Sequence, residues 1–347
     1  MKRFPAIKGA FLAIAAAILF GASTPLVQQA GFGVSAWMTA ALLYAGAAIT
    51  GILLRSKTTI EAPLQKQHWP RLILMAIFGA VLGPAALAWG LQHTGGMGAS
   101  LMLTLEAVFT VLLAIVLYRE KIGARVALAI ALMTLGAAML VLDQTDNGKS
   151  QTLGLLAVMA ATLAWGIDNS LSRGLAELDP AQVILGKAVL GAGSSFLIAI
   201  MLGGTSINAS QGIFLLLIGA IGYGLSLRFY LLAQRSFGAS RTGSLFAAAP
   251  FIGAAIAFGL GERQTSMVLI AATILMIIGV FLHLTEDHEH THGHDDLEHE
   301  HAHRHDDGHH THAHLDMPSG AHSHKHQHTA TRHRHPHVPD AHHDHSH

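Results

Sequence analysis

The sequence contains no cysteine, and charged residues are scarce over most of its length. Without cysteine, the chain can form neither disulfides nor thiolate metal sites, so its composition carries no information about the redox compartment. Charged residues make up 12% of the chain, and residues 1–285 hold 17 Lys and Arg against 9 Asp and Glu. Such a long, apolar and thinly charged region is typical of a protein that crosses a membrane repeatedly.

Motifs of enzymes and of nucleic-acid-binding proteins are also lacking. We find no Gly-rich phosphate-binding loop and no nucleophile constellation, so we expect no enzymatic activity, and ATP-driven transport would need a separate subunit. The basic residues are dispersed over short connecting segments, which gives no support for nucleic-acid binding. No clear small-residue cleavage site follows the first apolar stretch, so we expect that stretch to remain as a span rather than to be removed as a signal peptide.

Ten apolar stretches are long enough to cross the hydrocarbon of a bilayer, which takes about 20 residues in a helix. They lie at 7–28, 34–54, 71–93, 97–118, 122–142, 153–172, 181–202, 212–234, 241–260 and 265–284. The sequence therefore predicts an all-α integral membrane protein of ten transmembrane helices, with the lipid bilayer as its main partner.

The apolar region is an internal repeat. At a constant offset of 142 residues, Leu103, Val108-Phe109 and Glu120 match Leu245, Pro250-Phe251 and Glu262; at an offset of 145, Phe20-Gly21 matches Trp165-Gly166. Internal repeats are a recurrent plan of secondary transporters. We therefore expect three parts: a five-helix repeat over 1–142, a second five-helix repeat over 143–285, and a tail over 286–347.

The distribution of positive charge predicts the orientation. With a cytoplasmic N-terminus, 13 Lys and Arg lie at the N-terminus and in cytoplasmic loops, against Lys149 and Arg263 on the outer side. Cytoplasmic loops retain Lys and Arg, so we expect a multi-pass protein of the inner (plasma) membrane with both termini in the cytoplasm. Because each half has an odd number of spans, the two halves should face opposite ways as an inverted repeat.

Ten spans in two halves, with the aromatic-Gly pairs Phe20-Gly21 and Trp165-Gly166, Pro250-Phe251 and the two terminal glutamates, resemble the EamA-type exporters of the drug/metabolite transporter superfamily. The resemblance covers about residues 7–284, although Val108-Phe109 stands where the first half would normally carry Pro-Phe. It implies proton- or gradient-coupled export from the cytoplasm of substrates that range from amino acids to drugs. The chain looks most similar to the branch with a His-rich C-terminus, which is associated with nickel and cobalt resistance.

Four ionisable residues fall inside predicted spans, namely Glu106, Asp168, Lys187 and Arg228. A charge at the centre of a span costs roughly 2.5–3.5 kcal/mol, so each needs a partner or a wet cavity. We expect a transport path in which Glu106 exchanges a proton or cation, Asp168 with Asn169 receives a cation from the cytoplasm, and Lys187 and Arg228 are counter-charges. Ion pairs that merely orient helices are the alternative.

Three prolines, Pro25, Pro84 and Pro250, fall within predicted spans. Proline frees a carbonyl on the preceding turn, and broken helices often line the path of a transporter. We expect each proline to interrupt its helix, either along the transport path or as a simple packing kink.

The tail holds 23 of the 26 histidines, mostly as His-X-His units interleaved with Asp and Glu, and almost no apolar residues. Neutral imidazole suits Zn, Cu, Ni and Co. We therefore expect a disordered, multi-site metal-binding tail; a pH-sensitive polycation that gates the transporter is the alternative. The expected ligands are His288, His290, His292, His294, His299, His301, His303, His305, His309, His310, His312 and His314.

Two functions remain open. The first is a secondary exporter of divalent transition metal, nickel or cobalt first and zinc after them, coupled to protons. The second is an exporter of amino acids or related small polar metabolites whose tail buffers or senses metal. A membrane-anchored storage protein is disfavoured by the repeat and the charges within the spans. No cofactor is required in either reading, since metal is ligand or cargo, and a homodimer is one arrangement that the sequence leaves open.

Overall fold

The computed structural model describes residues 4–54, 63–118, 122–143, 149–172, 175, 178–237, 239–263 and 266–284, together with four short segments of the tail. Ten helical stretches in these ranges are long and apolar enough to cross a membrane. Their bounds lie within a few residues of the predicted spans, which confirms the all-α membrane architecture.

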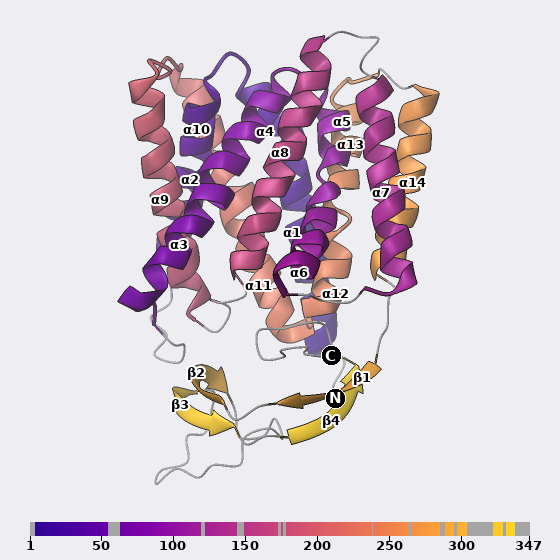
Figure 1. Cartoon of the computed structure of the whole chain (residues 1–347). Helices are drawn as coiled ribbons and strands as arrows, with labels where there is room; N and C mark the ends of the chain where they lie inside the picture. The colour runs from indigo at the N-terminus through magenta and orange to yellow at the C-terminus, as the bar shows by residue number, and fades with distance from the viewer. Residues whose placement is uncertain are drawn as a thin grey trace.

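The first half begins with two unbroken helices, and its third and fourth spans are interrupted (Figure 1). Its elements are α1 (Phe4–Ala30), α2 (Ala36–Leu53), the 3-10 turn η1 (Lys66–His68), α3 (Trp69–Ala76), the π segment η2 (Ile77–Leu82), α4 (Gly83–Leu91), α5 (Gly96–Met102), α6 (Leu105–Tyr118) and α7 (Ala124–Asp143).

The second half repeats this order, including a π segment in its third span and a break in its fourth. Its elements are α8 (Lys149–Ser172), α9 (Pro180–Met201), α10 (Ala209–Ile218), the π segment η5 (Gly219–Leu225), α11 (Ser226–Phe237), α12 (Ala239–Phe246), α13 (Ala249–Gly259) and α14 (Met267–Leu284).

The two halves run in opposite directions through the bundle. We call the end where α1 begins and α14 ends the tail side, and the opposite end the loop side (Figure 1). Helix α1 starts on the tail side, whereas α8, which has the same place in the second half, starts on the loop side. The structure is therefore the inverted repeat that an odd number of spans per half requires.

The halves interlock rather than stand side by side. The closest helix pairs each take one member from each half: α7 with α14, α2 with α9, α1 with α11, and α4 with α8. Glycine permits one of these approaches, because a Cβ on Gly46 of α2 would lie 2.1 Å from the carbonyl oxygen of Leu216. Close backbone contact at small residues replaces the hydrophobic driving force that lipid removes.

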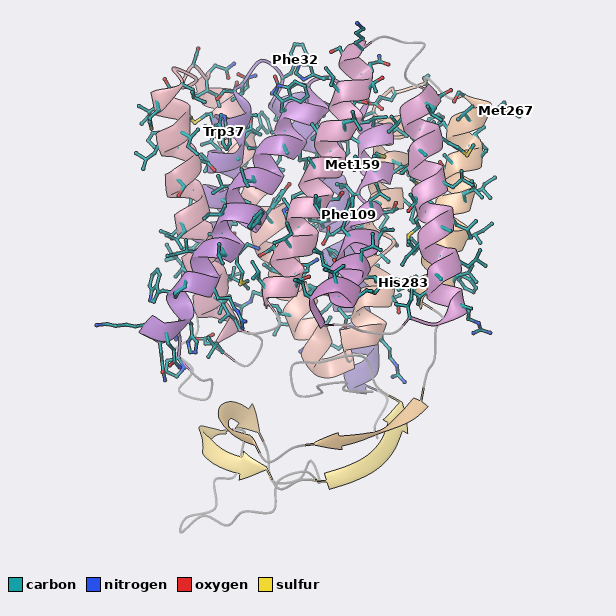
Figure 2. All side chains as sticks on the ribbon, in the orientation of Figure 1. Phe32, Trp37, Phe109, Met159, Met267 and His283 are labelled. Carbon is teal, nitrogen blue, oxygen red and sulfur yellow. The ribbon has the colours of Figure 1, made fainter. Side chains whose placement is uncertain are left out.

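Large apolar side chains cover the outside of the bundle. Met201 and Met267 are 83% and 82% exposed, and Phe281 is 64% exposed. In Figure 2, Met267 and Phe32 point away from the helices. Thirteen described polar side chains are buried, and only two of these, Asp168 and Asp179, are ionisable. A surface of this kind suits the acyl chains of a bilayer, as expected for a membrane-embedded protein.

The three prolines behave differently from one another. Pro25 lies inside the continuous helix α1, so the expected interruption there is wrong. Pro84 and Pro250 are each the second residue of a new helix, α4 and α13, which follows a π segment and a break respectively. Proline is well tolerated in the first turn of a helix. At Pro84, however, the preceding π segment continues directly into α4, so the missing N–H leaves a carbonyl of η2 without its donor.

Four short strands are described within the tail, as two antiparallel pairs. β1 (Glu289–His294) pairs with β4 (Thr331–Pro336), and β2 (Leu297–His303) pairs with β3 (His322–His328). The His-X-His alternation has the period of an extended strand. For the rest of the tail the predicted disorder stays a prediction. The Cα register sets His299, His301 and His303 opposite His326, His324 and His322.

Candidate functional site

The fourth span of each half is broken at an equivalent place. Helix α5 ends at Met102 and α6 begins at Leu105, while α12 ends at Phe246 and α13 begins at Ala249. The first break has no proline within it. The Thr104 hydroxyl donates to the Leu101 carbonyl at 2.9 Å, and such side-chain competition for backbone carbonyls weakens a helix.

Glu106 lies in the first turn of α6, immediately after this break. One of its carboxylate oxygens accepts a hydrogen bond from the Asn169 side-chain amide at 2.8 Å. The positive end of the α6 dipole also favours a carboxylate at this position. Glu106 is half-buried, and Asn169 is the one side chain that hydrogen-bonds its carboxylate among the described residues. The second carboxylate oxygen of Glu106 therefore has no side-chain hydrogen-bond donor among the described residues.

Asp168 and Lys187 form a hydrogen-bonded ion pair between α8 and α9. Their side chains are 9% and 17% exposed, so both charges are largely out of solvent. The backbone of η2 forms the adjoining wall, because a Cβ on Gly79 would lie 2.3 Å from the Asp168 carboxylate and 2.7 Å from Lys187 Nζ. A glycine in the π segment is thus required to accommodate the pair.

The same Gly79 connects the ion pair to two aromatic side chains. Its carbonyl accepts hydrogen bonds from the Tyr44 hydroxyl at 2.5 Å and from Trp165 Nε1 at 3.0 Å. This carbonyl lacks its usual backbone donor, because the N–H of Gly83 bonds to Phe78 and Pro84 has no N–H. Tyr44 and Trp165 therefore satisfy a carbonyl that the π segment and the proline set free.

Aromatic rings from both halves surround these polar groups. The ring centroid of Phe20 lies 6.5 Å from that of Trp165, 5.9 Å from that of Tyr223 and 5.5 Å from that of Phe246. Tyr44 lies 5.8 Å from Tyr223 by the same measure. The rings come from α1, α2, α8, η5 and α12, so they span the interface between the halves next to the break after α12.

Arg228 binds the C-terminal end of a helix. Its guanidinium donates to the carbonyl of Leu54, the residue that caps the C-terminus of α2. Among the described residues, the structure shows one salt bridge, between Asp168 and Lys187. The prediction that the four charges within the spans pair with one another is therefore confirmed for one acid and one base. Glu106 and Asn169 form a second polar pair, and Arg228 closes a helix end.

The predicted metal ligands divide into two groups. His290, His292 and His294 lie in β1, and His299, His301 and His303 lie in β2. His288, His305, His309, His310, His312 and His314 are outside the described residues. Among the described residues, no three His, Asp or Glu side chains come together as a metal site.

Comparison with known proteins identifies the family. The model of the EamA-like transporter family matches residues 7–142 and again residues 152–285. The chain belongs to the EamA-like transporter family. A relative 30% identical over 227 residues, which cover 64% of this chain and 66% of that protein, is an uncharacterized transporter from Methanothermobacter thermautotrophicus. A solved crystal structure with a TM-score of 0.58 and 18% identity covers 81% of this chain and 96% of that one, and shows the fold.

The two regions that the family model matches are the two halves of the bundle. Members of this family are transporters rather than enzymes. In transporters built from inverted repeats, the substrate lies near the bilayer midplane at the interface of the repeats, next to discontinuous helices. The breaks after α5 and α12 are such discontinuities.

Sequence reasoning did not find Tyr44, Gly79 or Tyr223 as parts of the site of this EamA-like transporter. Each lies in an apolar stretch and carries no formal charge, so neither hydropathy nor charge distinguishes it. Trp165 did give a signal, because it is the repeat counterpart of Phe20.

We predict that Lys187→Met destabilises this EamA-like transporter by about 3 kcal/mol, because it leaves the buried Asp168 carboxylate without its partner. The double variant Asp168→Asn/Lys187→Met should recover most of that loss, since it removes both charges. Thermal unfolding of the purified, detergent-solubilised proteins measures both. A single variant as stable as the wild type would contradict a buried, mutually dependent pair.

Proposed function

We propose that this EamA-like transporter is a secondary active exporter in which Glu106 exchanges the coupling proton. The observation that supports the proposal is a half-buried carboxylate beside a helix break, between the two halves, with one amide as its side-chain partner. A carboxylate inside an apolar bundle is stable either protonated or beside a cation. Proton and cationic cargo would therefore compete for Glu106, which is the requirement for exchange.

The Asp168–Lys187 pair would have a different part in this scheme. Each of its charges already has a partner, so it can hold α8 and α9 in place beside η2 without binding cargo. Because Asp168 and Asn169 are consecutive on α8, the pair also fixes the rotation of the helix that presents Asn169 to Glu106. We propose that Asp168 receives an arriving cation only when Lys187 moves away.

We propose a divalent transition metal, nickel or cobalt first, as the cargo. The tail supports this choice, because 23 histidines with interleaved carboxylates form a strong metal-binding composition. The tail follows α14, which ends on the same side as the start of α1 (Figure 1). With both termini in the cytoplasm, the tail would concentrate metal at the entrance of the path in the inner membrane.

The bundle itself favours a refinement of this cargo. Its described residues contain no three-ligand metal site, and the Asn169 amide is the side chain that hydrogen-bonds the Glu106 carboxylate. The aromatic side chains of Tyr44 and Trp165 hydrogen-bond to the nearby Gly79 carbonyl. A metal ion chelated by an amino acid such as histidine would bring its own ligands and present an organic body to the rings. The same observation favours the second candidate, an exporter of small polar metabolites whose tail buffers or senses metal.

We predict that Glu106→Gln abolishes export while the protein inserts and folds normally, because the amide keeps the shape of the side chain but cannot exchange a proton. Asp143→Asn is the matched control, since Asp143 lies at the loop-side end of α7 and accepts a hydrogen bond from Ser266 at 2.8 Å. Export is measured as cell-associated metal at equal protein abundance. Normal export by Glu106→Gln would remove Glu106 from the mechanism.

We predict that truncation after Leu284 weakens nickel and cobalt resistance without eliminating transport. In the full-length protein, metal binding by the tail should fall as the pH drops through about 6.5, because protonated imidazole cannot bind a metal. A metal-sensitive host challenged separately with Ni, Co, Zn and Cu gives the resistance, and cell-associated metal gives the transport. Unchanged accumulation of all four metals by the full-length chain would favour the metabolite exporter.

A further inference from the structure

At the loop side of the bundle, a carboxylate of the second half accepts hydrogen bonds from the first turn of a helix of the first half. Glu262 follows α13, and its two carboxylate oxygens accept hydrogen bonds from the backbone N–H groups of Gly96 at 2.6 Å and Met97 at 2.8 Å. These are the first two residues of α5, whose N-cap residue, Gly95, provides no side-chain hydrogen bond. Glu262 thus supplies the missing cap of α5 from the other half of the protein.

The backbone at the end of α13 directs the Glu262 side chain towards α5. Gly261 has a φ of +112°, a backbone conformation that favours glycine, and it turns the chain back so that the N–H of Glu262 bonds to the Ala257 carbonyl at 3.2 Å. The guanidinium carbon of Arg263 lies 4.4 Å from the centroid of the Phe258 ring. Arg263 therefore packs within its own half, while Glu262 reaches across to α5.

The receiving end of α5 is equally specific. A Cβ on Gly96 would lie 2.4 Å from Gln28 Oε1 and 3.1 Å from Glu262 Oε1, so the close approach of these groups depends on glycine. Gln28, near the end of α1, also donates to the Thr94 carbonyl at 3.1 Å. The ends of α1, α5 and α13 are therefore joined at one point on the loop side.

Nearer the centre of the bundle, small residues allow the same three helices to pack closely against one another. A Cβ on Gly253 of α13 would lie 2.8 Å from both the Gly21 carbonyl oxygen of α1 and the Ser100 hydroxyl oxygen of α5. Ser100 itself is fully buried. On the loop side, α5 and α13 thus pack tightly against one another between the two halves.

Among the described residues, the tail side lacks the helix packing that is equivalent to that of α5 against α13. The inverted repeat relates α5 to α12 and α13 to α6, so a symmetric molecule would pack α6 along α12 as closely as α5 along α13. In the described part of the chain, α6 and α12 make at most marginal contact. The close packing of α5 against α13 on the loop side therefore has no counterpart between α6 and α12 in the described residues.

We propose that Glu262 is a gating residue, a latch whose hydrogen bonds to Gly96 and Met97 hold the loop-side gate shut and which must release α5 for cargo to leave. A transporter of this architecture opens its central site to one side at a time by moving one part of the bundle against the other. The latch ties together the two helices that would have to separate. It acts on the equilibrium between states, and it touches neither Glu106 nor any cargo.

The absence of cysteine makes the chain suitable for a direct test with single-cysteine probes. Ser100→Cys reports the loop-side gate, because Ser100 is fully buried beneath the latch. Ala248→Cys reports access from the tail side, because Ala248 is exposed at the α12–α13 break and is the repeat counterpart of Glu106. Each probe is labelled in membranes with an impermeant maleimide that is applied separately to the two faces.

Glu262→Ala should raise loop-side labelling of the Ser100→Cys probe about fivefold, the population change expected from losing one capping interaction. It should at the same time lower tail-side labelling of the Ala248→Cys probe. Glu262→Gln, which keeps one acceptor oxygen, should fall between Glu262→Ala and the wild type. Arg263→Ala is the matched control, since Arg263 packs within its own half, and it should change neither rate.

Only the opposite movement of the two labelling rates supports a latch. A rise at both probes would mean that Glu262→Ala merely loosens the bundle, and unchanged rates would mean that Glu262 is a static cap. Either result, or a change at one probe alone, overturns the proposal. Because the measurement involves no cargo and no coupling ion, its failure would leave the assignment of Glu106 unaffected.

Discussion

An ionised side chain inside an apolar bundle must be paired or must reach water, and the arrangement of this transporter's interior follows from that constraint. Asp168 meets it with Lys187, in a pair that is 9% and 17% exposed. Glu106 meets it only in part, through one amide of Asn169. The constraint therefore separates a charge pair that is complete from a carboxylate that can still accept a proton or a cation.

The inverted repeat explains why this carboxylate lies where it does. The two halves run in opposite directions, and the broken fourth span of each contacts that of the other, through α5 and α13. Within that symmetric frame the side chains have diverged, since Glu106 corresponds to the exposed Ala248 and Phe20 corresponds to Trp165. The duplicated backbone thus provides the broken helices, and the differences between the copies provide a single acid.

Local properties of the sequence were sufficient to predict the spans, because length and apolarity decide membrane insertion. The prolines were a weaker guide. Pro25 deprives the Gly21 carbonyl of its usual donor, but α1 continues and the α13 backbone packs closely there, at Gly253. The break after α5 contains no proline, so no local feature of the sequence predicted it.

The partners of the charged residues could be predicted only in part. The four charged residues within the spans sum to zero, which predicted ion pairs, and the Asp168–Lys187 pair confirms this. No local feature of the sequence indicated that Lys187 rather than Arg228 would be the partner of Asp168. Tyr44 and Gly79 enter the site through a carbonyl left free by a π segment and Pro84, which is a tertiary relation. In the tail, composition predicted metal binding, while the pairing of β1 with β4 and of β2 with β3 depends on contacts between residues 19 to 47 positions apart.

The placement of Glu106 between the halves depends on the two halves facing opposite ways, and corresponding loops test this directly. Gln65 precedes the third span and Ser206 precedes the eighth, and both are exposed. In the cysteine-free chain, Gln65→Cys and Ser206→Cys should react with an impermeant maleimide from opposite faces of the membrane. Labelling of both from the same face would contradict the inverted repeat, and with it the placement of Glu106 between two opposed halves.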